Sequence, residues 1–143
     1  LSYIDQNGEK QTPVVLHRAI FGTFDRFTAF LLEETKGALP FWCSPVQVNV
    51  IPVNNKYHLD YATDIKNKLK DLNFRVNLDS REEKLGYKLR ESVVNKTPIT
   101  VILGQSEVDN NTISYRLYGS EDTTTISIDE FINFLNDKIK NKD

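Results

Sequence analysis

The segment from Ile99 to Leu103 is a nearly continuous apolar run, bounded by Pro98 and Gly104. A strand of this composition is typical of the interior of a sheet that helices cover on both faces. A membrane-spanning segment needs roughly 18 apolar residues, and no uncharged apolar stretch of the chain approaches that length. The run therefore predicts a buried central strand in a soluble α/β domain.

Segments with strand and helix patterns alternate along the rest of this part of the chain. Apolar residues recur with a period of two in three further strands that we expect, at 46–52, 74–78 and 113–117, and 123–126 is expected to be a fifth strand. Helices are expected at 59–72, at 80–95 and from 127 onward, with apolar stripes that reach Leu72 in the first and Ile139 in the last. Ser80 with Glu83, and Ser127 with Glu130, have the spacing of a capping box, which marks a helix start.

The order of these segments from residue 46 is strand, helix, strand, helix, three strands and a final helix. Strands that are separated by helices pair in parallel through right-handed crossovers. We therefore expect a three-layer α/β domain at 40–143, with a mixed, mostly parallel five-stranded sheet flanked by helices. Sheets of this kind bind ligands at the carboxyl ends of their strands.

The N-terminal residues 1–39 have a different pattern. The turn-like segment 5–8 predicts a hairpin, with 1–4 as its first strand and the apolar 14–16 as its second. Thr23 has the character of a helix N-cap and Gly37 that of a helix stop, with phenylalanines at helical spacing between them. The segment 37–40 is predicted to be a linker, so this part is expected to be separate from the α/β domain.

The residue inventory makes an autonomous enzyme hard to build. The chain contains no P-loop, no dinucleotide-binding glycine motif and no metalloprotease or hydrolase motif. Cys43 is the only cysteine, which excludes an internal disulfide and indicates a reducing compartment. The net charge is -2, but Lys and Arg outnumber Asp and Glu between residues 54 and 96, so a local basic surface can coexist with an acidic total.

Four segments carry a specific resemblance. Residues 17–27 (HRAIFGTFDRF) resemble motif 3 of a class II aminoacyl-tRNA synthetase, in the form found in the threonyl-tRNA synthetase family. Residues 44–48 (SPVQV), 79–91 (DSREEKLGYKLRE) and 104–108 (GQSEV) are similar to the anticodon-binding domain that follows motif 3 in that family. The resemblance covers essentially the whole chain in unbroken order. It implies a strand and helix remnant of the antiparallel catalytic domain, followed by a complete anticodon-binding domain.

The resemblance also implies roles for the N-terminal residues. Arg26 would contact the phosphates of ATP, which binds with Mg²⁺, and Gly22 and Thr23 would border the aminoacyl-adenylate pocket. His17 would be one of three protein ligands to a zinc ion that recognises threonine, but the other two ligands are not present in this chain. We therefore expect the chain to bind no cofactor by itself and to be a catalytically inactive part of a longer ligase.

In the α/β domain the resemblance places Glu107 and Arg116 at the anticodon bases, with Lys84 and Lys96 near the RNA. Glu82 stands where many family members have Asn, and a carboxylate accepts hydrogen bonds but repels phosphate, so direct base contact by Glu82 is doubtful. Arg81, Lys84 and Lys88 are three and four residues apart, which on a helix from residue 80 would form one basic stripe suited to backbone phosphates.

The resulting interpretation is the C-terminal, tRNA-binding part of a cytoplasmic synthetase of the threonyl type. Its expected partner is threonine tRNA rather than DNA or a membrane, and the parent enzyme is expected to be a homodimer. A related synthetase of the prolyl, glycyl or histidyl type is one alternative, which His17 within the HRA sequence argues against. A non-enzymatic interaction module is the other alternative, which the presence of Arg26 argues against.

Overall fold

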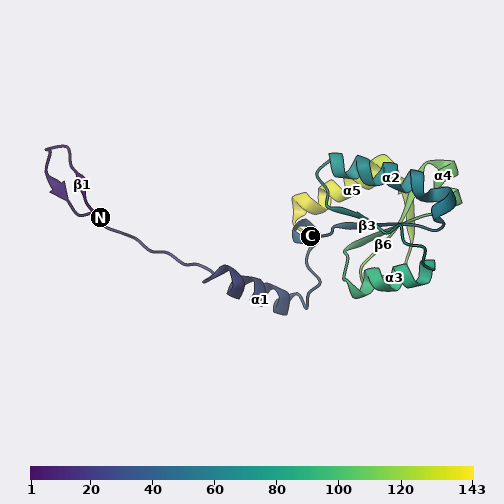
Figure 1. Ribbon diagram of the computed structural model, residues 1–143, viewed down its shortest axis with the longest axis horizontal. Coiled ribbons are helices and arrows are strands. Elements are labelled where there is room, and N and C mark those ends of the chain that lie inside the picture. Colours follow the sequence, from purple (N-terminus) through teal and green to yellow (C-terminus); the bar gives the residue numbers. More distant parts are fainter.

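The computed structural model describes residues 1–143 as an elongated N-terminal segment followed by an α/β domain (Figure 1). The N-terminal segment contains a hairpin of β1 (Tyr3–Ile4) and β2 (Lys10–Gln11), an extended stretch and helix α1 (Phe24–Glu34). Helix α1 has no buried residue, although its N-cap is Thr23, as predicted. The N-terminal segment therefore extends away from the α/β domain instead of packing on it.

The α/β domain is built on one five-stranded sheet. Its strands lie in the order β4 (Val76–Leu78), β3 (Val48–Pro52), β5 (Ile99–Leu103), β6 (Thr112–Leu117) and β7 (Thr124–Ser127). β3 pairs in parallel with β4 and β5, whereas β6 pairs antiparallel with both β5 and β7. β6 alone runs against the other four strands, so the predicted mixed, mostly parallel sheet is confirmed.

Helices cover the sheet on both faces, which gives three layers (Figure 1). Helices α2 (Asn55–Asp71) and α5 (Ile128–Asn141) lie on one face, and α3 (Leu85–Val94) lies on the other. A short helix, α4 (Gln105–Asn110), follows the carboxyl end of β5. None of the helices is both long enough and apolar enough to cross a membrane.

The face toward α2 and α5 holds the apolar core. Residues that are paired across neighbouring strands point to the same face of a sheet, so the register identifies the members of each face. The fully buried members of this core come from β3, β5, β6, α2 and α5: Val48, Val50, Ala62, Ile99, Val101, Leu103, Ile113, Phe131 and Leu135. Their burial supplies the main hydrophobic stabilisation of the domain.

The face toward α3 carries a row of polar residues beside the apolar Ile51 and Ile102. Asn77, Asn49, Thr100 and Arg116 occupy one row across the sheet, as the register of β4, β3, β5 and β6 shows. Asn77 Nδ2 donates to Asn49 Oδ1 at 2.8 Å, and Asn49 Nδ2 donates to Ser92 Oγ of α3 at 3.4 Å. Asn49 is only 7% exposed. The polar residue of the alternating pattern in β3 is therefore buried under α3 and not exposed to solvent.

The segment before β3 is held to the domain through its backbone carbonyl groups. Arg75 donates from Nε to the Ser44 oxygen and from Nη2 to the Trp42 oxygen, both at 2.8 Å. Gln47 Nε2 donates to the oxygen of Phe41, whose ring is buried in the 3₁₀ turn η1 (Phe41–Cys43). These bonds fix the place where the chain enters the sheet.

Several predicted elements are confirmed. All five strands of the large sheet occur close to their predicted positions, and Ser127 and Glu130 form the predicted capping box at the start of α5. Helix α4 was not predicted from the sequence. It is six residues long and largely polar, and its start is stabilised by the Glu107 side chain, which accepts from the backbone N–H of Gly104.

Three predictions about local structure are wrong. The segment 14–16 is exposed and outside any strand, because Asp5 accepts backbone N–H bonds from Asn7 and Glu9 and so closes a shorter hairpin. The apolar stripes stop early, since Leu72 is 47% and Ile139 is 41% exposed at the ends of their helices.

The third wrong prediction is the capping box of Ser80 and Glu83. Helix α3 starts at Leu85, with Lys84 at its N-cap and no side-chain hydrogen bond to that cap. Residues 79–84 form a loop because distant groups compete for its backbone: Asn55 of α2 donates to the carbonyl oxygens of Ser80 and Arg81.

Candidate nucleic-acid interface

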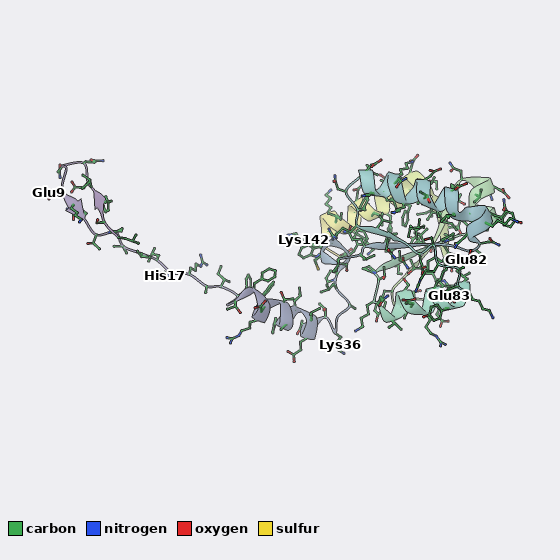
Figure 2. The ribbon with its side chains drawn as sticks, in the orientation of Figure 1. Glu9, His17, Lys36, Glu82, Glu83 and Lys142 are labelled. Atoms are coloured by element: carbon green, nitrogen blue, oxygen red, sulfur yellow. The ribbon has the colours of Figure 1, made fainter.

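The carboxyl ends of the three parallel strands β3, β4 and β5 meet at one end of the domain. We call this surface the carboxyl edge and define it as residues 53–57, 79–87 and 104–107. The backbone N–H of Val53 donates to the Leu103 oxygen, and that of Asp79 donates to the Val50 oxygen, both at 2.9 Å. Figure 2 shows Glu82 and Glu83 of this edge far from Lys36, which lies in the linker at the other end of the domain.

Two clefts flank the 79–84 loop at the carboxyl edge. One, of about 250 Å³, lies between this loop and the start of α2 and is lined by Asn55, Lys56 and Glu82 among others. The other, of about 300 Å³, lies between the loop, β4 and α3, and nine of its ten lining residues are polar or charged. Arg81 and Lys88 line both clefts, so the two residues form the wall between them.

Glu107 is fixed at the start of α4 by two donors. The Gly104 N–H donates to Oε2 at 2.8 Å, and the Ser114 hydroxyl donates to Oε1 at 2.7 Å. Burial by itself would raise the pKa of Glu107, but these hydrogen bonds outweigh it, and the pKa lies below its usual value. The carboxylate is therefore ionised near neutral pH and retains lone pairs that can accept from the amino groups of a base.

Arg116 lies on the polar face of β6, opposite the buried side chains of Ile113 and Tyr115, as predicted. Ser114, which binds Glu107, precedes Arg116 by two residues on the same face of the strand. One pleat of a strand spans about 7 Å, so the fold brings Glu107 and Arg116 to neighbouring positions on one surface.

The surroundings of Arg116 leave part of its guanidinium available. Its Nε donates to Thr123 Oγ1 at 2.7 Å, and its two terminal nitrogens make no hydrogen bond within the chain. Arg116 lines a cleft of about 420 Å³ together with Arg90 of α3 and the half-exposed Tyr118. This cleft combines two cationic groups and an aromatic ring with one carboxylate, that of Glu121, and its cations and ring suit a nucleobase and its phosphate.

The predicted basic stripe of Arg81, Lys84 and Lys88 is wrong as a helical feature, because α3 begins only at Leu85. Arg81 donates from Nε and Nη2 to the carboxylate of Asp79 at 2.8 and 2.6 Å, and Nη2 also donates to Glu91 at 2.6 Å. Lys88 is only 2% exposed and donates to the backbone oxygen of Asp79 at 3.1 Å. Of the three cations, Lys84 alone is exposed and without an acidic partner.

Lys96 lies outside the carboxyl edge. It follows α3 and precedes β5, so it is at the amino end of the strand whose other end leads to Glu107. Its Nζ donates to the backbone oxygen of Lys36, in the segment that joins α1 to the domain. The structure therefore separates Lys96 from Glu107 and from the 79–84 loop, but not from Arg116, because Thr97 lines the same cleft as Arg116. Lys96 itself binds the segment that joins α1 to the domain.

Two exposed tyrosines at the carboxyl edge were missed by the sequence analysis. Tyr57, in the first turn of α2, is 64% exposed, and Tyr87, in the first turn of α3, is 55% exposed. Each has a cation near its ring, with Lys56 Nζ 5.5 Å and Arg81 Cζ 5.9 Å from the ring centroids. Unstacked RNA bases bind to such rings. In the sequence, each of these tyrosines stands beside a lysine near a helix start, and this pattern could have indicated them.

The residues indicated near ATP lie at the start of α1. Gly22, with a positive φ of 74°, turns the chain into the helix, and Thr23 Oγ1 accepts from the Arg26 N–H at 3.3 Å. All three residues are exposed. His17 lies in the extended stretch between β2 and α1 (Figure 2), and no group of three or more His, Cys, Asp or Glu side chains converges anywhere in the structure.

Comparison with known proteins gives a consistent set of relatives. A family described as "Anticodon binding domain" matches residues 47–138. The threonine--tRNA ligase of Oceanobacillus iheyensis is 48% identical over 142 residues, and that of one Staphylococcus aureus strain is 50% identical over 142 residues. Each alignment covers 99% of this chain but only 22% of the relative.

A solved structure has the same arrangement of elements. The RNA binding domain of threonyl-tRNA synthetase from Cryptosporidium parvum superposes with a TM-score of 0.83 at 29% identity. The superposition covers 96% of this chain and 35% of the other. The likeness therefore includes nearly all of this chain and a minor part of a longer relative.

Proposed function

Since this chain belongs to the anticodon-binding domain family, we propose that it is the tRNA-reading part of a threonine--tRNA ligase. The observation that carries the proposal is the near 50% identity with such ligases, which extends over 99% of the chain. The identity includes the N-terminal segment as well as the α/β domain. A related synthetase or an unrelated interaction module would not be expected to match over this length.

In the longer protein, the N-terminal segment would contribute to the active site. The reaction joins threonine to its tRNA at the expense of ATP, in the cytoplasm. Arg26 would stabilise phosphate charge through its guanidinium, and Gly22 and Thr23 would place that arginine at the start of α1. The expected zinc ion and the expected homodimer belong to that longer protein. This chain by itself would bind tRNA without catalysing a reaction.

The α/β domain would read the anticodon loop at the carboxyl edge and on the adjoining polar face of β6. Glu107 supplies a fixed acceptor and Arg116 supplies donors, which together match the edges of splayed bases. Tyr57 and Tyr87 provide rings on which bases stack. Lys84 provides an exposed charge for a backbone phosphate.

A binding measurement tests this function directly. The chain is titrated against a threonine tRNA transcript and against the same transcript with the second or third anticodon base changed, at two salt concentrations. We expect tighter binding of the unchanged transcript, with a preference that persists at the higher salt. Equal affinity for all transcripts would contradict anticodon reading and would leave only charge-driven RNA binding.

A further inference from the structure

The loop of residues 79–84 has a buried base and an exposed tip. Asp79, at its start, is only 6% exposed. Glu82, Glu83 and Lys84, at its tip, are exposed, and none of the three side chains makes a hydrogen bond or ion pair within the chain. Exposed loops are usually more mobile than helices and strands, but the tip of this loop is attached to a base that hydrogen bonds hold in place.

Three contacts hold the base of this loop from different directions. Lys88 of α3 donates to the Asp79 backbone oxygen at 3.1 Å. Arg81 bridges the carboxylates of Asp79 and Glu91, with distances of 2.6 Å to each from Nη2. From the opposite side, Asn55 of α2 donates to the backbone oxygens of Ser80 and Arg81, at 2.5 and 3.2 Å.

The charges in this group neutralise one another. Arg81, first through its hydrogen bonds, and Lys88, through its charge, lower the pKa of Asp79, which stays ionised despite its burial. The hydrogen bonds to Asp79 and Glu91 in turn raise the pKa of Arg81. The charges of the two carboxylates thus compensate those of the two cations: Arg81 is bound to both carboxylates, and Lys88 is buried against the backbone oxygen of Asp79.

We propose that Arg81 and Lys88 are positioning residues, which fix the 79–84 loop so that its tip meets the anticodon loop in one conformation. The inference rests on the proposed function and assigns these two cations a task other than phosphate contact. A loop that is ordered before binding loses less conformational entropy when RNA binds, and it presents its side chains at fixed positions. The loss of the contacts made by either Arg81 or Lys88 should therefore weaken anticodon discrimination more than it weakens general RNA binding.

Salt dependence separates positioning from phosphate contact. Each phosphate that a protein neutralises on single-stranded RNA adds about 0.7 to the slope of log K against log salt. We expect Lys88→Met and Arg81→Lys to leave this slope unchanged while lowering the preference for the threonine anticodon about tenfold or more. The matched control is Lys84→Ala, which removes the exposed cation of the same loop and should lower the slope while the preference is retained.

Two further measurements keep the test decisive. Glu91→Gln removes the negative charge at the α3 end of the Arg81 bridge and leaves a weaker, neutral acceptor. It touches no buried group, so it should fold normally and show the same loss of preference in weaker form. Amide hydrogen exchange within 79–84 should be faster in all three variants than in the parent chain, and unchanged in Lys84→Ala.

The possible outcomes distinguish this inference from the proposed function. If the parent chain shows no anticodon preference, the proposed function fails. The exchange rates still show whether Arg81 and Lys88 hold the 79–84 loop in place. If the parent discriminates but Glu91→Gln and Arg81→Lys keep both its preference and its slow exchange, the positioning role is wrong. A reduced salt slope in Lys88→Met, with the preference intact, would instead make Lys88 a phosphate contact.

Discussion

The Ser114 hydroxyl donates to Glu107 Oε1 at 2.7 Å, and this bond joins helix α4 to strand β6. It links a helix and a strand that follow one another closely in the sequence. Because the Gly104 N–H occupies the other carboxylate oxygen, Glu107 has one orientation. Because both carboxylate oxygens accept hydrogen bonds, protonation of Glu107 weakens the link between α4 and β6.

The first prediction concerns acid stability. The pKa of Glu107 is lower in the folded chain than the ordinary value of 4.5, so the carboxylate contributes stability that is present above pH 4.5 and is lost as pH falls through the folded pKa. Ser114→Ala should make the free energy of unfolding less steep with pH in this range. Urea unfolding at several pH values measures the slope, with Ser120→Ala as an exposed control. Identical slopes for both variants would contradict the assignment.

The second prediction concerns base recognition by Arg116. Arg116→Ala should weaken binding to threonine tRNA by about 1 to 3 kcal/mol and reduce discrimination against other anticodons, because donors to a base edge are lost. Thr123→Ala, which removes only the partner of Nε, should have a smaller effect of the same kind. Titration against two transcripts measures both quantities. An unaltered anticodon preference in Arg116→Ala would show that the reading surface lies elsewhere.

The third prediction concerns stacking by Tyr87. Tyr87→Ala should cost about 1 to 3 kcal/mol of tRNA binding, whereas Tyr87→Phe should bind nearly as well, because the ring and not the hydroxyl makes the contact. Tyr3 is similarly exposed, at 52%, but lies in the N-terminal hairpin, so Tyr3→Ala is the matched control. Equal losses in Tyr87→Ala and Tyr3→Ala would indicate an unspecific effect.

The fourth prediction concerns the core under α5. Leu135 is fully buried, and Leu135→Ala should lower the free energy of unfolding by about 2 to 5 kcal/mol because it removes buried contacts and leaves a cavity. Leu32 of α1 is 45% exposed, and Leu32→Ala should change stability by less than about 0.5 kcal/mol. Chemical denaturation compares the two. A small loss for Leu135→Ala would contradict the packing of α5 on the sheet.

The strands and the terminal helix could be predicted from sequence because their signals are local. The apolar run at Ile99–Leu103 and the capping box of Ser127 with Glu130 depend on neighbouring residues, and both are confirmed. Periodicity alone did not predict the burial of Asn49, which is a polar residue of the alternating pattern in β3. Asn49 is buried, and its side chain is hydrogen-bonded to Asn77 and Ser92.

The loop at 79–84 could not be predicted because its conformation depends on distant partners. Ser80 and Glu83 have helix-start spacing, but Asn55 is 25 residues away from Ser80 and donates to its backbone oxygen. Such tertiary hydrogen bonds override a local capping preference. Lys88 is buried by a further tertiary contact, its hydrogen bond to the backbone oxygen of Asp79, so the spacing of the basic residues alone did not predict which of them are exposed.

The candidate site was predicted in part. The resemblance singled out Glu107 and Arg116, and the fold brings them to neighbouring positions on one surface. It also singled out Lys96, which the fold places at the other end of the domain. The role of each residue toward RNA stays a prediction. Tyr57 and Tyr87 escaped notice because an exposed aromatic residue gives no periodic signal of its own.

The attachment of the linker has a consequence for how this chain can vary between species. Lys96, Arg75 and Gln47 all donate to backbone oxygens of the segment 36–44, and every peptide unit carries such an oxygen whatever its side chain. The segment can therefore vary in sequence while its path is preserved, except at Gly37, which has a positive φ of 76°, and at the buried Phe41 and Ser44. The side chains that fix the path of this segment therefore belong to the α/β domain, whereas the segment itself contributes mainly backbone oxygens.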